Sequence, residues 1–282
     1  MKKVVFSIIS TNLRYTNILL RYVDILLSRR LIHIVHIWCY GITEQFSRDL
    51  SNVCHRNPKY VLFEPPLPDE KRGHYYQHYS KYLKENEVLI KCDDRVVYLD
   101  VNTFGTFIDN ITEDVVYFPN MVNNDVCAYF QQEEGSHDLF NYPVNKEKLK
   151  EFAAKTGQAY ALSDWHKEPD KAIAIHCMFL KNKSRFLPHM EENKIIEYGN
   201  HMHLNMFGIT AKYAKEMFPG INPQVAFNDN QYFAIAPLHN GKKNKICLGF
   251  LAVYFAFDEQ DVIQLEEQYL SKYEEMALAQ SL

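Results

Sequence analysis

The sequence predicts an α/β fold in which helices cover both faces of a mostly parallel central sheet. Apolar, β-branched runs alternate with stretches of helical periodicity through the first 125 residues. Hydrophobic residues make up 47% and charged residues 23% of the 282-residue chain, a composition typical of globular proteins. No Gly/Ser/Pro-rich linker interrupts the sequence, so we expect a single domain over residues 1–282, with two halves, 1–125 and 126–282, that complete each other.

The first half predicts a regular order of strands and helices. Apolar or aromatic runs predict four strands, at residues 4–10, 31–40, 60–63 and 87–92. Helical spacing of apolar residues predicts the helices between them, at residues 17–30, 44–55 and 74–83. This order indicates right-handed β-α-β units, and such sheets bind ligands beyond the carboxyl ends of their strands.

The second half has weaker periodicity. We expect strands at residues 114–119 and 246–257. Helical patterns lie at residues 146–156, 165–180 and 210–217, and a long C-terminal helix follows Asp258 as its N-cap.

Composition excludes several classes of protein. The net charge of −4 does not favour a nucleic-acid partner bound through a broad basic surface. No run approaches the roughly 20 apolar residues of a membrane span, and Asn12 and Arg14 interrupt the N-terminal apolar run before it resembles a signal peptide. The six cysteines lack the paired spacing of zinc sites and the density of disulfide scaffolds. We therefore expect a cytoplasmic protein.

The most informative segment follows the 87–92 strand. Here Lys91, Asp93, Asp94 and Arg95 lie between two apolar stretches. Burying paired carboxylates is costly unless a cation or strong hydrogen-bond donors compensate, so the segment predicts a site for a metal ion or a phosphate-bearing ligand. A solvated turn is the alternative. If the backbone stays extended, Asp93 and Arg95 point one way and Asp94 points the other.

At this segment the chain resembles the nucleotide-sugar glycosyltransferases of the GT-A fold. Many of them carry Lys-x-Asp-Asp-Asp before an apolar stretch, and Lys91, Asp93 and Asp94 match that motif. In the family, the first acidic residues approach the ribose and the donor sugar, and the last one binds a divalent cation that bridges the diphosphate. The resemblance implies a Rossmann-like three-layer α/β/α sandwich that binds a nucleotide-sugar donor.

The chain departs from the family at the last acidic position, which Arg95 occupies. A guanidinium cannot bind a metal ion, although it can neutralise a phosphate. One alternative is a divalent cation, Mn²⁺ or Mg²⁺, held by Asp93 or Asp94 together with the diphosphate. The other is a metal-free enzyme that uses cationic side chains. We expect the first alternative, with Lys91 and Arg95 balancing the diphosphate.

A second match to the family lies downstream. Residues 207–217, which include Gly208, resemble the glycine-led helix that lines the donor and acceptor pocket. Asp229 occupies the position at which many inverting members hold the catalytic base. Such a carboxylate takes the proton of the acceptor hydroxyl as the hydroxyl attacks the anomeric carbon. A helix N-cap is the alternative role for Asp229.

Other residues match the family more weakly. Ser10, Thr11 and Arg14 follow the first strand, where family members hold the base and ribose. A plain helix start is the alternative for Ser10 and Thr11. Asn123 and Asn124 follow a predicted strand and would face the donor sugar or the acceptor.

Two segments contribute aromatic or imidazole side chains. Trp165 could stack on a sugar ring or belong to the core. His201 and His203 have the i, i+2 spacing that points two side chains the same way along a strand. With a third ligand they could bind a metal ion, but we expect His203 to line the acceptor pocket.

These observations predict a glycosyltransferase that moves a sugar from a nucleotide-diphosphate donor to a hydroxyl of a glycan or glycoprotein. Because UDP is the commonest donor nucleotide of the family that the chain resembles, the resemblance implies a UDP-sugar donor, of which UDP-xylose is one example, and we expect inversion with Asp229 as the base. Two alternatives remain. A sugar nucleotidyltransferase would normally carry a glycine-rich phosphate loop, and residues 10–17 contain no glycine. A non-catalytic glycan-binding protein derived from a transferase is favoured by Arg95.

Overall fold

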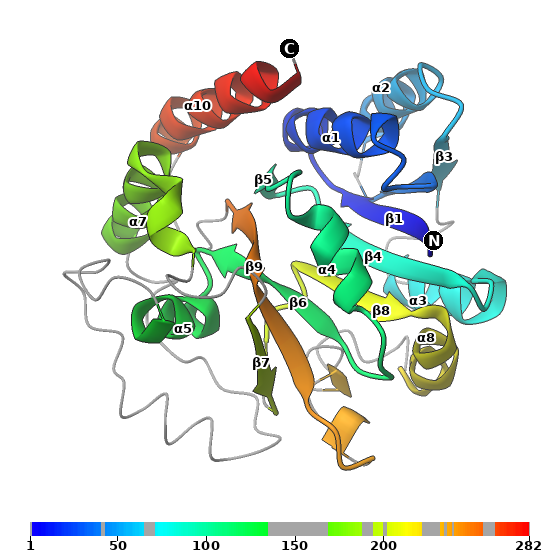
Figure 1. Ribbon diagram of the computed structural model, residues 1–282. Coiled ribbons are helices and arrows are strands. Elements are labelled where there is room, and N and C mark those ends of the chain that lie inside the picture. Colours follow the sequence, from blue (N-terminus) through cyan, green and yellow to red (C-terminus); the bar gives the residue numbers. More distant parts are fainter. Residues whose placement is uncertain are drawn as a thin grey trace.

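The structure is a computed structural model in which one mixed sheet is flanked by helices (Figure 1). It describes residues 2–40, 43–64, 71–134, 169–187, 194–199, 202–221, 232–233, 236–238, 240–255 and 263–281. The strands are β1 (Lys3–Ser10), β2 (Ile34–Cys39), β3 (Tyr60–Phe63), β4 (Glu87–Asp93), β5 (Val96–Leu99), β6 (Tyr117–Val122), β7 (Ile195–Tyr198), β8 (Met206–Thr210) and β9 (Asn244–Tyr254). The α-helices are α1 (Leu13–Ser28), α2 (Glu44–Cys54), α3 (Lys71–Tyr82), α4 (Phe104–Asn110), α5 (Asp125–Glu134), α7 (Pro169–Lys181), α8 (Ala211–Met217) and α10 (Ile263–Ser281).

Most strands of the sheet run in one direction. The spatial order is β3-β2-β1-β4-β8-β6-β9-β5, with β7 also paired to β9. β1 to β4 pair in parallel, and β8 is antiparallel to both β4 and β6, so β6 and its parallel partner β9 run the same way as β4. β5 and β7 pair antiparallel with β9. The predicted α/β class with a mostly parallel sheet is therefore confirmed.

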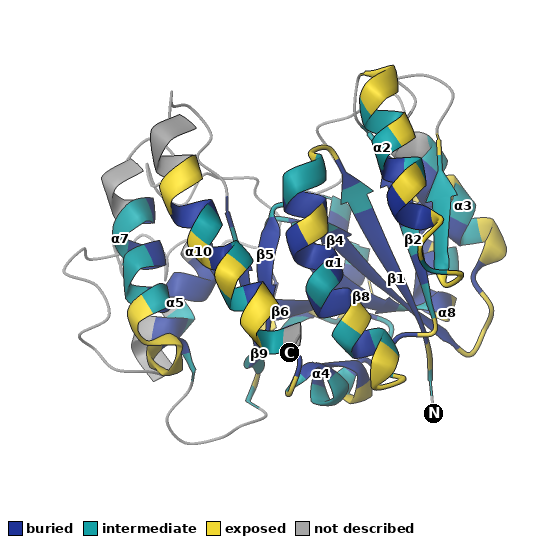
Figure 2. Cartoon of the chain, turned by 90° about the horizontal axis from the view of Figure 1, so that it is seen from above, coloured by how far each residue is buried: buried dark blue, intermediate teal, exposed yellow. Residues whose placement is uncertain are grey.

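The alternation of side chains along β1 separates the two helical layers. Phe6 packs against Phe104 of α4, with ring centroids 6.2 Å apart. Ser7 points to the other face, where its hydroxyl accepts a hydrogen bond of 2.8 Å from Tyr79 of α3. Because successive strand residues face opposite ways, α4 and α3 cover opposite faces of the sheet. Figure 2 shows buried residues along the strands and exposed residues on the outer surfaces of α1, α2 and α10.

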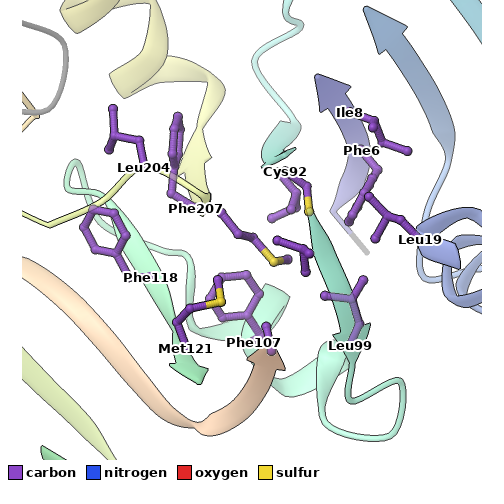
Figure 3. Close-up of a cluster of buried hydrophobic side chains, with 14 of the residues drawn as sticks. Phe6, Ile8, Leu19, Cys92, Leu99, Phe107, Phe118, Met121, Leu204 and Phe207 are labelled. Atoms are coloured by element: carbon purple, nitrogen blue, oxygen red, sulfur yellow. The ribbon is translucent and has the colours of Figure 1, made fainter. Parts of the chain in front are cut away.

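The core lies between the sheet and these helices. Figure 3 shows Phe6, Leu19, Cys92, Phe107 and Met121 converging from β1, α1, β4, α4 and β6. All five side chains are almost completely buried. Burial of this apolar surface is the main stabilising term for the fold, and its continuity across both halves of the sheet ties them together.

Gly208 does not begin a helix, so the prediction for residues 207–217 is wrong at its start. Met206–Thr210 form β8, and α8 begins at Ala211, where Thr210 accepts a capping bond of 3.2 Å from the Tyr213 N–H. A Cβ at position 208 would overlap the Ile111 side chain and lie 3.0 Å from Cδ1 of Ile90. Gly208 therefore allows close packing inside the sheet.

The remaining predicted elements have mixed outcomes. The strand expected at 114–119 lies at Tyr117–Val122, and α7 begins at Pro169 within the helix expected at 165–180. α4, α5 and β7 were not predicted. The helix expected at 146–156 lies outside the described residues. Among the described residues, no helix combines the length and apolar character needed to cross a bilayer.

Candidate functional site

A cavity of about 340 Å³ opens at the carboxyl edge of the parallel strands. Thr11 follows β1, Tyr40 follows β2, and Asp94 and Arg95 follow β4. The segment of residues 203–205 also lines it, because β8 runs antiparallel and therefore starts at this edge. The cavity lies where ligands of open α/β sheets bind.

Asp94 is buried at the floor of this cavity, with only 2% of its surface exposed. Its Oδ2 accepts hydrogen bonds from the backbone N–H groups of Thr11, at 2.6 Å, and Asn12, at 2.7 Å. The Thr11 hydroxyl lies 3.1 Å from both carboxylate oxygens. Asp94 thus holds the loop between β1 and α1 in place, and both of its oxygens are engaged in doing so.

Burial and hydrogen bonding act on the Asp94 carboxyl in opposite directions. Burial raises its pKa, and the backbone N–H groups of Thr11 and Asn12 lower it, because they bind the ionised form. Burial dominates, and the pKa rises to about 6. Near neutral pH the group is ionised, so the loop binds a carboxylate.

Asp93 and Lys91 form an ion pair beside Asp94. Lys91 Nζ lies 2.6 Å from Asp93 Oδ1 and also donates to the Leu204 carbonyl. Only 6% of the Lys91 side chain is exposed, compared with 26% for Asp93. The ammonium therefore has two acceptors within the protein, and Asp93 balances its charge.

Arg95 lies in a turn, and the expected alternation of side chains stops there. β4 ends at Asp93, and Asp94 and Arg95 form the turn to β5. The Arg95 guanidinium lies over the ring of Tyr15, 5.7 Å from its centroid. Asp94 and Arg95 therefore both contact the start of α1, whereas the prediction placed them on opposite sides.

Tyrosines form much of the remaining cavity wall. Tyr75 and Tyr76 of α3 line it together with Tyr40 and Tyr254. Sequence reasoning missed all four. The only signal was the tyrosine-rich composition of the helix predicted at 74–83 and the tyrosine that ends the predicted strand at 31–40.

Several predicted site residues lie in structural contacts instead of lining the cavity. The Ser10 hydroxyl is fully buried, 2.6 Å from the Thr16 hydroxyl. Arg14 turns toward the C-terminal helix, where Nε lies 2.6 Å from Glu274 Oε1 and an Nη nitrogen lies 3.1 Å from Oε2. Neither residue is among the described residues that line the cavity.

The asparagine pair after β6 also has structural contacts. Asn123 has a left-handed backbone with φ of 66°, and its amide donates to the Tyr254 carbonyl at 3.0 Å. Asn124 accepts a bond of 3.0 Å from the Cys127 N–H, a typical helix-start contact at the beginning of α5. Asn123 supports the cavity indirectly, because Tyr254 lines it. Of the other predicted residues, His203 lines the cavity, and Trp165 and Asp229 lie outside the described residues.

The described cavity residues do not fit a divalent cation. Mn²⁺ and Mg²⁺ require several oxygen ligands. Asp94 is engaged by Thr11 and Asn12, Asp93 is paired with Lys91, and Arg95 is itself a cation. In the part of the chain that the structure describes, no three His, Cys, Asp or Glu side chains cluster in a way that could hold a metal ion.

Comparison with known proteins identifies the fold. No protein-family model matches the chain, and no curated protein matches its sequence. Among solved structures, the chain is similar to GalNAc-T7, crystallised with UDP, GalNAc and Mn²⁺, with a TM-score of 0.56 and 12% identity. That match covers 92% of this chain and 44% of the GalNAc-T7 chain, so the protein spans less than half the length of its structural relative.

A second match is the 4-diphosphocytidyl-2C-methyl-D-erythritol synthase of Anaerococcus prevotii DSM 20548. The TM-score is 0.49 and the identity 10%, with 96% of each chain covered. At these identities the likeness concerns the fold. The chain has the GT-A-like α/β fold that it shares with GalNAc-T7, with a charged cavity at the carboxyl edge of its parallel strands.

Proposed function

We propose that the protein is a glycosyltransferase that binds a nucleotide-sugar donor in the cavity at the carboxyl ends of β1 and β4. The observation that carries this proposal is the gathering of Thr11, Lys91, Asp93 and Arg95 around one cavity at the ligand-binding edge of a GT-A-like sheet. The UDP and GalNAc in the GalNAc-T7 crystal support a UDP-sugar as the donor.

The cavity offers different surfaces to the parts of such a donor. The nucleoside would pack against the tyrosines of α3 and the Thr11 loop, because aromatic rings and backbone groups suit a base and a ribose. The diphosphate would lie toward Arg95, whose planar guanidinium forms paired hydrogen bonds to phosphate oxygens. The donor sugar would then face the His203 segment, where a glycan hydroxyl approaches.

The proposed reaction is a direct displacement with inversion. The acceptor hydroxyl oxygen forms a bond to the anomeric carbon, and the bond from that carbon to the diphosphate breaks. Negative charge develops on the leaving diphosphate, and the fixed positive charge of Arg95 would stabilise it. A carboxylate takes the hydroxyl proton, and we assign that role to Asp229 from its position in the sequence.

Release of nucleoside diphosphate from a panel of nucleotide sugars, with and without glycan acceptors, tests the proposal. We expect the nucleotide sugars of one nucleotide to raise the midpoint temperature of thermal unfolding. One of them should release its nucleoside diphosphate when a suitable acceptor is present. Asp229→Asn should lower kcat by about 100-fold or more and leave donor affinity within about twofold. Turnover that survives this change would remove Asp229 from the mechanism.

A non-catalytic glycan-binding protein is the competing function. It is favoured by the internal engagement of Asp93 and Asp94, which a catalytic donor site would expose to its ligand. This function would be supported if the protein bound a glycan and if no nucleotide, at millimolar concentration, raised its midpoint temperature of unfolding.

A further inference from the structure

The start of α1 already binds the protein's own acceptors. Helix N-termini bind phosphate groups in many nucleotide-binding folds because their first N–H groups lack partners. Here the Thr11 and Asn12 N–H groups donate to Asp94. The Arg14 and Tyr15 N–H groups donate to the Asn12 side chain, at 2.9 and 3.5 Å. A ligand phosphate could bind these groups only by displacing the almost fully buried Asp94 carboxylate or the Asn12 side chain that caps the helix.

A bridging metal ion would meet the same obstacle. It would need oxygens from the aspartate pair, yet Asp94 binds the β1–α1 loop and Asp93 binds the Lys91 ammonium. Moving Asp94 toward a metal ion would leave two backbone N–H groups without acceptors, which is costly in a buried site. Among the described residues, neither the N–H groups at the start of α1 nor a metal ion held by the aspartate pair is therefore suited to bind a diphosphate.

Among the described residues that line the cavity, Arg95 is the remaining side chain with a permanent positive charge. The charge of Lys91 is balanced by Asp93, and its ammonium also donates a hydrogen bond to the Leu204 carbonyl. Arg95 makes no ion pair with any carboxylate of the described residues, and its guanidinium is held over the Tyr15 ring. A cation–π contact with a ring does not use up the N–H donors of a guanidinium, which stay available to a phosphate.

We infer that the cavity binds its diphosphate ligand through the Arg95 guanidinium, in the place that a divalent cation takes in metal-dependent relatives. This inference rests on the proposed function and reverses the cofactor expected from the sequence. It assigns Asp94 a positioning role, which is to hold the Thr11 loop against the cavity. The protein should therefore bind a nucleoside diphosphate equally well with and without divalent metal.

The experiment measures binding of UDP, UMP and uridine to the full chain by calorimetry, in Mn²⁺, in Mg²⁺ and in EDTA, and tests CDP, GDP and ADP under the same three conditions. We expect the Kd for UDP to agree within about twofold across the three conditions. Arg95→Gln should weaken UDP binding by at least about tenfold and uridine binding by less than about twofold, because only the diphosphate meets the guanidinium. Arg95→Lys should recover part of the affinity. Arg48→Gln, at an exposed arginine on α2, is the matched control and should bind like the unchanged protein.

The outcomes separate the inference from the proposed function. UDP binding that requires metal and vanishes in EDTA would overturn the inference and keep the donor site. UDP binding in EDTA that Arg95→Gln and Arg95→Lys leave unchanged would also overturn it. If UDP, CDP, GDP and ADP all fail to bind in every condition, the proposed function itself fails. Thermal unfolding of each variant checks that it is folded before its affinity is compared.

Discussion

Two hollows border α3, and their side chains are bound in different ways. The cavity at the ends of β1 and β4 combines four tyrosines with charged groups, of which Asp94 and Lys91 are bound internally. The second, of about 280 Å³, has an aromatic wall of Trp38, Phe63, His78 and Tyr82, and its lining also includes Glu64, Gln77 and Lys81. α3 contributes to both hollows. Charged side chains that the protein already holds in place by hydrogen bonds can orient a ligand. Aromatic rings that stack on one another mainly stabilise the fold.

The aromatic hollow is organised around a buried hydroxyl. Trp38 and Phe63 stack across β2 and β3 with centroids 4.7 Å apart and planes 12° from parallel. The Tyr79 hydroxyl accepts from Trp38 Nε1 at 3.0 Å and donates to Ser7 at 2.8 Å. This arrangement ties α3 to β1 and β2, so its loss should affect the whole N-terminal half.

Trp38→Ala should give the largest change in stability. It removes a buried ring and the hydrogen bond to Tyr79, so we expect the free energy of unfolding to fall by about 3–5 kcal/mol. Urea unfolding measures this change, and UDP affinity of the folded protein should stay within about twofold. Tyr82→Ala is the control, because Tyr82 is 68% exposed and should cost under about 0.5 kcal/mol. A free energy of unfolding that Trp38→Ala leaves unchanged would contradict the structural role of the hollow.

Asp94→Ala should affect both stability and binding. It leaves the Thr11 and Asn12 N–H groups without their acceptor, and we expect a loss of about 2 kcal/mol. The loop they belong to lines the cavity, so UDP affinity should fall as well. Urea unfolding and calorimetry measure the two effects. Unchanged affinity in a folded Asp94→Ala protein would show that the loop does not contribute to binding.

Asp94 and His36 should give opposite responses of stability to acid; His36 lies beside the aromatic hollow, with its ring centroid 4.9 Å from that of Phe63. The pKa of Asp94 in the folded state is about 6, above its ordinary 3.8, so the folded state binds the proton before the unfolded state does. Lowering the pH from 7 to 5 should therefore raise the contribution of Asp94 to the free energy of unfolding by about 1 kcal/mol. Burial, together with the neighbouring His78, lowers the pKa of His36 from 6.5 to about 4, so the unfolded state binds the proton first. The same lowering of pH should therefore reduce the contribution of His36 to the free energy of unfolding by about 2 kcal/mol. Asp94→Asn should remove the first contribution and His36→Gln the second, as unfolding at both pH values would measure. Parallel pH profiles for the two variants would contradict these assignments.

Arg14→Gln should give the smallest change. Its ion pair with Glu274 has side-chain exposures of 40% and 34%, so solvent screening limits its contribution to under about 1 kcal/mol. Thermal unfolding measures the effect, and UDP affinity should not change. A tenfold loss of affinity would return Arg14 to the donor site, where the sequence first placed it.

The sequence predicts the N-terminal half well because its signals are local. The helix predicted at 44–55 is α2, whose N-cap Thr43 accepts from the Phe46 N–H at 3.2 Å. β8 was missed because it has five residues, includes Gly208, and pairs with strands about 90 to 120 residues earlier. α4 was missed because it is short and Thr103 makes no side-chain capping bond.

The candidate site, like the fold, was predictable from the sequence only in part. Strand ends that share an edge bring Thr11, Asp93 and Arg95 to one cavity, and the order of elements was enough to expect that. The bond from Asp94 to the Thr11 loop was not predictable, because it depends on the turn that ends β4. Arg14 was misplaced because its partner, Glu274, lies on a helix 260 residues away in the chain.

The position of β8 decides how the chain can be divided. It fills the space between β4 and β6, and it pairs with β4 over five residues from Val88 to Cys92. A fragment ending near residue 125 would carry the predicted nucleotide-binding half but would expose the hydrogen-bonding edge of β4. Open edges of this kind recruit other strands and promote aggregation. Residues 1–125 therefore cannot be excised as a separately folded unit, and any fragment that carries β4 should keep residues 206–210 in place.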